Sequence, residues 1–206
     1  MTITDIIEHD KKKVLVQVDC SILFPMYKNE LAKYHLRKEA EIPREVYVQI
    51  MEELLPKRAK LRAMHLLQKR TYTKTMLGKK LLEGRYPECI VEEAIEYVAS
   101  YGYVDDMRYT LEYIRCYCES RSQKRIFQDL FAKGIDKDTA TRAWDLFEEE
   151  NMPVDEEKQI KALLQKKHFD AAKADRKETA KVINFLCRKG YSMDSIFRCI
   201  RVDEIY

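Results

Sequence analysis

The residues of this sequence that come nearest to a catalytic or metal-binding pair are the adjacent aspartates Asp105 and Asp106. They lie in the stretch SYGYVDDMRY, residues 100–109, just after a glycine flanked by tyrosines. Two neighbouring carboxylates can hold a divalent cation through their oxygen atoms, or they can transfer protons as an acid and a base. They can also do no more than begin a helix, because carboxylates accept hydrogen bonds from its free N–H groups. The surrounding elements decide between these functions.

No further group of residues completes an active site. The glycines are isolated rather than gathered in a phosphate-binding loop, and neither the zinc-protease pattern HExxH nor the nucleophile-elbow pattern GxSxG occurs. The four histidines are scattered and the six cysteines include no CxxC pair, so we expect reduced thiols that pack as small apolar side chains. The sequence predicts a protein that is not an enzyme and needs no metal or cofactor.

Composition predicts a soluble, mainly helical protein of the cytoplasm. Of the 206 residues, 46% are hydrophobic and 35% are charged, while only 5 are glycine and 5 are proline. This balance favours helices with charged outer faces over a turn-rich sheet. The N-terminus, MTITDIIEHDKKK, lacks the apolar core of a signal peptide, and no apolar run approaches the roughly 20 residues that span a bilayer.

Residues 57–85 concentrate positive charge within a chain whose formal net charge is only +3. The segment contains ten lysines and arginines and a single acidic residue, Glu83. A run of this kind can bind nucleic acid or an acidic protein surface. The alternative is a solvated helix face with no partner, and both interpretations stay open at this point.

The first 55 residues differ from the rest because they hold nearly all of the strand patterns. KVLVQVD (13–19) alternates in the manner of a strand, and the β-branched TITDIIEH (2–9) precedes it. SILFPM (21–26) suggests a third short strand that ends at Pro25, and KNELAKYHL (28–36) suggests a short helix. We predict a small β-containing module that leads into helix.

From about residue 57 onward the sequence repeats a two-helix pattern three times. LGKKLLEGRYPECIVEEAI (77–95), IFQDLFAKGIDKDTATRAW (126–144) and VINFLCRKGYSMDSIFRCI (182–200) align without gaps. In each copy apolar residues four apart form one helix face, and an apolar residue follows the end of the helix. Gly134 and Gly190 end the helix in two copies, whereas Arg85 stands at that position in the first, so we expect its turn to differ.

A third helical pattern precedes each pair, at residues 59–70, 105–119 and 154–168. Units of this size bury little core alone, and neighbouring units therefore stack. The predicted fold is mainly α, with tandem three-helix repeats that form an elongated curved rod after a small β-containing N-terminal module. The predicted parts are an extension, 1–55, and three repeats, 56–104, 105–152 and 153–206.

This organisation gives residues 100–109 a structural role. Gly102 ends the last helix of the first repeat, and Tyr103 and Val104 bridge to the next helix. Asp105 is placed to cap that helix, and Asp106 complements the positive end of its dipole. Both aspartates are then explained without a metal.

The same stretch resembles the central motif of the RecX family. That motif has a glycine, an aromatic and an aliphatic residue before two aspartates, and then an arginine and an aromatic residue. The matching residues here are Gly102, Tyr103, Val104, Asp105, Asp106, Arg108 and Tyr109. Met107 departs from the pattern, because this position is often acidic in the family. SQKRIFQDLFAKGID (122–136) is similar to the family's second repeat, while residues 59–77 and 31–42 look like its first repeat and its N-terminal extension.

The resemblance implies a modulator of the recombinase RecA, acting in recombination and DNA repair without enzymatic activity. Such a protein lies along the groove of the RecA–DNA filament and inhibits its ATPase and strand exchange. We expect a monomer that touches DNA indirectly or weakly through basic faces. The candidate partner-binding residues are Lys79, Lys80, Arg121, Lys124 and Arg125. We predict that changing the last three to Glu abolishes inhibition without loss of thermal stability. The alternative is a helical-repeat protein that binds nucleic acid directly, without RecA.

Overall fold

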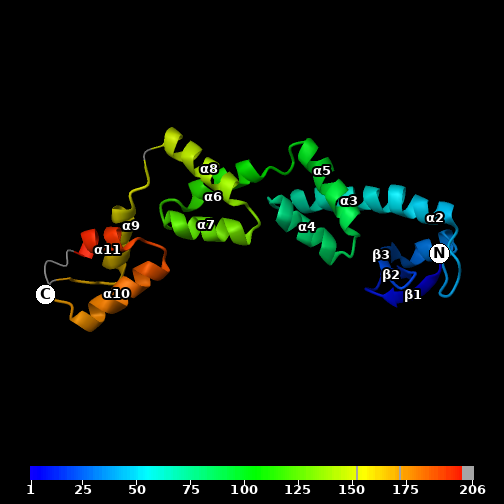
Figure 1. Ribbon diagram of the computed structural model, residues 1–206, viewed down its shortest axis with the longest axis horizontal. Helices are drawn as coiled ribbons and strands as arrows, with labels where there is room; N and C mark the ends of the chain where they lie inside the picture. The colour runs from blue at the N-terminus through cyan, green and yellow to red at the C-terminus, as the bar shows by residue number, and fades with distance from the viewer. Residues whose placement is uncertain (152, 172, 201–206) are drawn as a thin grey trace. The chain divides into compact units, whose positions relative to one another are not determined.

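The computed structural model of the chain describes residues 1–151, 153–171 and 173–200. They belong to two compact units, Met1–Asp105 and Asp106–Tyr206 (Figure 1). Both units are mainly helical, and the first also contains a three-stranded sheet. The predicted fold class, mainly α with a small β-containing N-terminal module, is confirmed, whereas the curved rod stays a prediction. The predicted second and third repeats include residues 152, 172 and 201–206, which lie outside the described residues.

The strands form an antiparallel sheet in the order β1-β2-β3, with β1 (Ile3–Glu8), β2 (Lys13–Val18) and β3 (Ile22–Tyr27). Alternate residues of a strand face the same side, and Val14, Val16 and Val18 are accordingly buried along β2. The short helix α1 (Lys28–Lys33) follows β3 directly, within the segment predicted to be helical. The three predicted strands and the helix after them are confirmed. The predicted end of the third strand at Pro25 is wrong, because β3 continues through Pro25 to Tyr27 and stays paired with β2.

The sheet and the first three-helix repeat share one core. The helix α2 (Arg44–Val48), the π-helical turn η1 (Gln49–Leu54) and the helix α3 (Leu55–Leu67) follow one another without a break. They are followed by α4 (Lys74–Glu83) and α5 (Glu88–Ser100). One buried cluster contains side chains from strands and helices alike, including Phe24, Met26, Ile50, Leu77 and Val98. The N-terminal module is therefore packed onto the first repeat.

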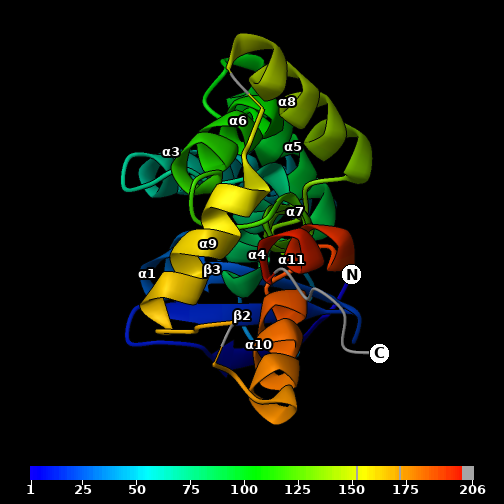
Figure 2. The ribbon, with the colours of Figure 1, turned by 90° about the vertical axis from the view of Figure 1, so that its left-hand side faces the viewer.

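The second unit contains two further sets of three helices. The helices α6 (Asp106–Tyr117), α7 (Gln123–Ala132) and α8 (Lys137–Glu150) surround a core that includes Ile114, Ile126 and Trp144. The helices α9 (Glu156–Lys166), α10 (Arg176–Arg188) and α11 (Met193–Ile200) surround a core that includes Ile160, Leu186 and Ile196. Figures 1 and 2 show α11 against α9 and α10. The helices thus succeed one another in threes, while the division of the chain into four parts stays a prediction.

In the aligned helix pairs, the N–H of the residue after the turn donates back into the preceding helix at Ile135 and Tyr191 but, among the described residues, not at Tyr86, so the first turn differs in detail as expected. The positive φ of the two glycines is nevertheless shared by Arg85. Its φ of +62° is close to the +83° of Gly134 and the +94° of Gly190. In this left-handed conformation Cβ comes close to the following carbonyl oxygen, so Arg85 carries strain that the glycines avoid. The turn is retained because the residue after it is buried in every copy: Tyr86, Ile135 and Tyr191.

Two expectations from composition have different outcomes. The cysteines are unpaired in the described part of the chain, but only Cys118 is buried, whereas Cys20, Cys89 and Cys116 are exposed. The prediction that the thiols pack as small apolar side chains is therefore wrong for these three. None of the helices in the described ranges is both long enough and apolar enough to cross a membrane.

Candidate interaction site at the junction of two repeats

The stretch 100–109 joins the end of α5 to the start of α6. Gly102 has φ +71°, and its N–H donates to the oxygen of Ala99 at 2.8 Å, so it ends α5 as predicted. Asp105 immediately precedes α6, and Asp106 is the first residue of that helix. Among the described residues, no three His, Cys, Asp or Glu side chains are placed to hold a metal ion. The capping role of Asp105 stays a prediction, at the position where a cap belongs.

The other residues of this stretch have different surroundings. Val104 is buried in the core of the first unit. Tyr109 packs along α6 against Tyr113, with ring centroids 6.3 Å apart. Arg108 and Tyr103 are exposed. The motif is therefore structural at Gly102 and Val104, whereas Tyr103 presents its ring to solvent.

Lys79 and Lys80 lie on α4 of the first unit. Lys79 is exposed, and the Nζ of Lys80 lies 2.7 Å from a carboxylate oxygen of Glu83 one turn away. An exposed pair of this kind stabilises a helix by less than about 1 kcal/mol. It nevertheless partly neutralises Lys80, so these two lysines form no concentrated positive cluster.

Arg121, Lys124 and Arg125 surround the first turn of α7, where the second and third repeats meet. Ser122 caps this helix, because its Oγ accepts a hydrogen bond from the N–H of Arg125 at 3.3 Å. The same Oγ donates to the main-chain oxygen of Lys189 at 2.8 Å. The start of α7 is therefore held against the turn between α10 and α11, which brings further cations to the site.

Four cations line one pocket of about 420 Å³ at this place, namely Arg121, Arg125, Arg188 and Lys189. The lining also includes Ser120, Phe185 and Tyr191, and it contains no acidic residue. Lys124 lies beside the pocket, since its Cβ is 3.4 Å from the point where a Cβ on Gly190 would be. We refer to the four lining cations and Lys124 together as the basic junction.

Two of these cations share one carboxylate. Asp129 lies 2.6 Å from an Nη atom of Arg121 and 3.1 Å from an Nη atom of Arg125. Arg121 also donates to the hydroxyl of Tyr113 at 3.0 Å, and its guanidinium lies 3.9 Å from the ring centre of Tyr117. Burial alone would lower the pKa of Arg121, but Tyr113 and Asp129 outweigh it and raise that pKa. Burial, followed by the charge of Asp129, raises the pKa of Tyr113. Arg121 is thus fixed in place and remains charged.

The remaining cations of the basic junction have no carboxylate partner in the described part of the chain. Lys124, Arg188 and Lys189 are exposed and form no ion pair within the ranges that the structure describes. Sequence reasoning missed Arg188 and Lys189, although the repeat alignment places them just before Gly190, at a turn with positive φ.

The pairing with Asp129 also changes the expected effect of charge reversal. A Glu at position 121 or 125 would face Asp129, whose side chain is only 17% exposed. Like charges this close repel, so these two substitutions should lower stability. The sequence-based expectation of unchanged thermal stability is therefore revised for Arg121 and Arg125 and kept for Lys124.

A buried polar bridge also holds the second and third repeats together. The hydroxyl of Tyr191 donates to Oε1 of Gln159 at 2.8 Å, and Nε2 of Gln159 donates to the main-chain oxygen of Cys118. Burial, with the charge of Glu156 as a second cause, raises the pKa of Tyr191 to about 12. Together with the contact between Ser122 and Lys189, this bridge fixes the cations of α10 relative to those of α7.

Comparison with known proteins supplies the family. Residues 155–200 match the family model described as RecX, third three-helix domain. A protein named regulatory protein RecX from Vibrio parahaemolyticus is 32% identical over 143 residues, which are 69% of this chain and 89% of the relative. The chain belongs to the RecX family. A RecX protein of Clostridium acetobutylicum is 30% identical over 199 residues, covering 95% of this chain and 92% of the relative.

Solved RecX structures have the same fold. A crystal structure of a regulatory protein RecX covers 99% of this chain and 100% of its own, with a TM-score of 0.64 and 24% identity. RecX from Lactobacillus salivarius covers 71% of this chain and 95% of its own, with a TM-score of 0.57 and 21% identity. Likenesses at such low identity concern the fold alone. The RecX membership predicted from residues 100–109 is confirmed by the closer sequence relatives.

Proposed function

We propose that this RecX-family chain is a non-enzymatic regulator of homologous recombination and DNA repair. It binds the RecA–DNA filament and inhibits the filament's ATPase and strand exchange, as a monomer in the cytoplasm. Membership of a family whose relatives are named regulatory protein RecX supports the regulatory role. The observation that carries the filament contact is the basic junction, where four cations line a pocket without an acidic residue.

The basic junction suits a partner built of protein and DNA. Guanidinium groups bind phosphate or carboxylate oxygens through paired hydrogen bonds, and lysines add mobile positive charge. The hydrogen bond from Ser122 to Lys189 holds the cations of α7 and α10 in one arrangement before the partner arrives. Less conformational entropy is then lost on binding, which strengthens the contact.

Inhibition follows from binding one state of the filament more tightly than the others. ATP turnover and strand exchange require the filament to pass through several states. A protein with higher affinity for one of them shifts the population toward that state and slows the cycle. Neither a catalytic residue nor a cofactor of the bound protein is needed for this effect.

The second candidate function is direct binding of nucleic acid without RecA. The specific observation that favours it is that Lys124, Arg188 and Lys189 form no ion pair among the described residues, so phosphates could engage them. Binding through phosphates alone weakens steeply with salt, because each phosphate contact releases counterions.

A titration at two salt concentrations separates the two functions. Labelled single-stranded DNA is titrated with the protein, with and without RecA and a non-hydrolysed ATP analogue. We expect weak, strongly salt-dependent binding to the naked strand and tight, less salt-dependent binding to the filament. Equal affinity for both, with the same salt slope, would favour direct nucleic-acid binding and contradict the proposed function.

A further inference from the structure

The three most exposed large apolar side chains among the described residues belong to one surface of the first unit. Tyr101, Leu61 and Tyr103 are 62%, 59% and 55% exposed. Single exposed apolar residues are ordinary on proteins, whereas a contiguous group marks an interaction site. Met64 and Tyr97 join the three into one surface, and we refer to these five residues as the α3–α5 patch.

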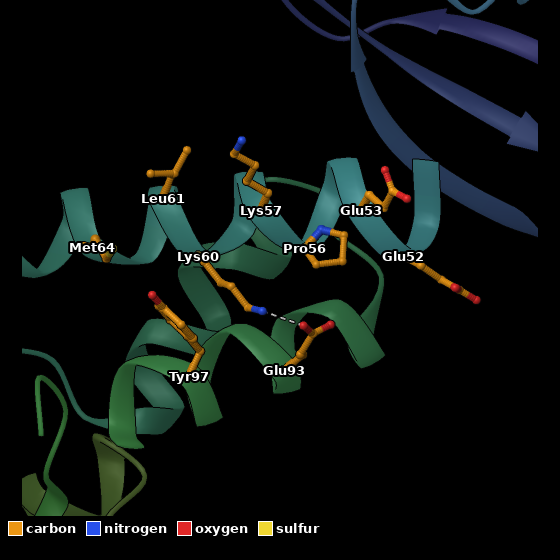
Figure 3. Close-up of a pocket in the computed structure, with 9 residues that line it drawn as sticks. All are labelled: Glu52, Glu53, Pro56, Lys57, Lys60, Leu61, Met64, Glu93 and Tyr97. Carbon is orange, nitrogen blue, oxygen red and sulfur yellow. Dashed lines mark hydrogen bonds and ion pairs between the residues drawn. The ribbon is translucent and has the colours of Figure 1, made fainter. Parts of the chain in front are cut away.

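The centre of the patch is a groove of about 320 Å³ between α3 and α5. Figure 3 shows Leu61 and Met64 on α3 and Tyr97 on α5, around this groove. A second hollow of about 260 Å³ begins where the groove ends, because Met64 lines both, and Tyr103 lines the second. The two hollows therefore adjoin at Met64.

The tyrosine rings extend this surface at the end of α5. The ring centroid of Tyr101 lies 5.0 Å from that of Tyr97 and 6.1 Å from that of Tyr103. The planes of Tyr101 and Tyr103 differ by only 18°, so the two rings are stacked. Stacked rings restrain one another, and they present a large apolar area whose ordering costs little entropy on binding.

Tyr103 is far more exposed than the residues at the same place in the three aligned turns. The N–H of Tyr103 donates to the oxygen of Val98, as the residue after the glycine does in this kind of helix stop. The residue at the same place after the aligned turns is buried in all three copies: Tyr86, Ile135 and Tyr191. Tyr103 is exposed instead, while the next residue, Val104, enters the core. The fold of the described unit therefore does not use the Tyr103 ring.

The charges around the groove favour a protein segment over nucleic acid. Three carboxylates line it, from Glu52, Glu53 and Glu93. Lys60 already forms an ion pair with Glu93, whose carboxylate lies 2.6 Å from its Nζ (Figure 3). The same Nζ lies 5.0 Å from the ring centre of Tyr97, in a cation–π contact. Lys57 is then the one remaining cation of the lining. A phosphate backbone would be repelled here, whereas a lysine or arginine beside Glu52 and Glu53 would be attracted.

The backbone at the acidic end of the groove is also unusual. Glu52 and Glu53 lie in η1, a π-helical turn of six residues between α2 and α3. Such turns are rare inside helices and occur frequently at functional sites, because they change the direction of side chains along one face. The turn offers two adjacent carboxylates beside the apolar groove.

We propose that the α3–α5 patch docks a short helical segment of a protein partner that presents apolar side chains and one lysine or arginine. The groove follows η1 and α3 from Glu52 to Met64, about 18 Å at 1.5 Å per residue, which suits roughly three turns of helix. The inference rests on the proposed function, and the segment belongs to RecA in the filament. Apolar side chains of the segment fill the groove, and its cation meets Glu52 and Glu53.

The test compares filament binding by matched variants. The double variant Leu61→Gln, Tyr103→Asn removes two apolar contacts, and Leu82→Gln is the control, because Leu82 is 41% exposed on α4 outside the patch. Each protein is titrated onto RecA filaments assembled on labelled single-stranded DNA. We expect binding at least tenfold weaker for the double variant and a change of less than twofold for Leu82→Gln, since few buried anchors dominate such interfaces.

A photo-crosslinking amino acid at position 61 gives a readout that does not depend on folding stability. We expect crosslinks to RecA within the filament and none to the DNA strand. Wild-type affinity of the double variant, or crosslinks to DNA alone, would overturn the docking proposal while the proposed function stands. If the wild-type protein itself fails to bind RecA filaments, the proposed function fails, and the docking proposal fails with it.

Discussion

The hydroxyl of Ser122 donates a hydrogen bond of 2.8 Å to the main-chain oxygen of Lys189, although 67 residues separate them in sequence. Ser122 caps α7, and Lys189 ends α10, so one side chain joins the start of one helix to the end of another. Arg121 and Arg125 lie beside Ser122 in sequence, and Arg188 precedes Lys189 at the end of α10. The basic junction therefore exists because two repeats meet there, and neither repeat would form it alone.

Substitution of Gly190 tests this contact. A Cβ at position 190 would lie 2.5 Å from the Oγ of Ser122 and 3.3 Å from the main-chain nitrogen of Arg125. The positive φ of +94° adds a conformational cost. We expect Gly190→Ala to lower the free energy of unfolding by about 3 kcal/mol, from left-handed strain and overpacking together. Urea unfolding followed by circular dichroism measures the loss.

Gly102→Ala is the matched control, because φ is +71° there and no atom lies within 4 Å of the added Cβ. Only the conformational cost then applies, and we expect a loss of about 1 kcal/mol. Equal losses for the two variants would show that the close packing of Ser122 against the turn at Lys189 contributes nothing to the junction.

Replacement of Arg85 by glycine should stabilise the protein. Arg85 is the non-glycine residue at the left-handed turn of the first aligned pair, with φ +62° and an exposed side chain. Arg85→Gly removes the strain but makes the unfolded chain more flexible, so we expect a net gain of about 0.5–1 kcal/mol. The control Lys79→Gly, inside α4, should lose about 1 kcal/mol. A loss at both positions would mean that the turn is not strained at Arg85.

The capping role of Asp105 is tested against a cap that the structure describes. Asp136 caps α8, with its carboxylate 2.8 Å from the N–H of Thr139. Lost N-caps typically cost about 1 kcal/mol, so Asp105→Ala and Asp136→Ala should destabilise the protein by similar amounts. Calorimetry of both variants gives the comparison. If Asp105→Ala is as stable as the wild type while Asp136→Ala is destabilised, the capping assignment of Asp105 is refuted.

Tyr191 makes stability depend on alkaline pH. Burial raises its pKa to about 12, above the value near 10 of an unfolded tyrosine. The contribution of this neutral tyrosine is therefore fully present below about pH 10 and is lost as pH rises from 10 to 12. We expect the stability of Tyr191→Phe to fall less steeply than that of the wild type over this window.

At neutral pH the same variant should be less stable by about 1 kcal/mol, because Oε1 of Gln159 loses its donor. Urea unfolding at several pH values from 8 to 11.5 checks both effects. Identical slopes for wild type and variant between pH 10 and 11.5 would contradict the assignment of this window to Tyr191.

Local patterns sufficed to predict much of the fold. The alternation of Val14, Val16 and Val18 predicts β2, because it puts these side chains on one buried face. The aligned repeats predict the helix pairs and the buried residue after each turn, since both depend on neighbours in sequence. The cap of α8 is equally local, because Asp136 accepts a hydrogen bond from Thr139, three residues further on.

Properties that depend on distant residues could not be predicted in this way. Asp129 pairs with Arg121 and Arg125, which converts two predicted contact residues into partly structural ones. Arg188 and Lys189 join the site only through a contact between repeats. The left-handed Arg85 was missed because the buried Tyr86 after it outweighs the backbone preference of arginine.

The measurement that tests the central claim most directly is the ATPase activity of RecA on single-stranded DNA with this protein added. We expect inhibition by the wild type and at least tenfold weaker inhibition by the double variant Lys124→Glu, Arg188→Glu. Both side chains are exposed and, among the residues that the structure describes, neither forms an ion pair, so folding should persist. The control Arg142→Glu, Lys177→Glu carries the same charge change on exposed residues outside the basic junction and should inhibit like the wild type. An ATPase rate unchanged by the wild-type protein would contradict the proposed function, and equal inhibition by both double variants would contradict the role of the basic junction.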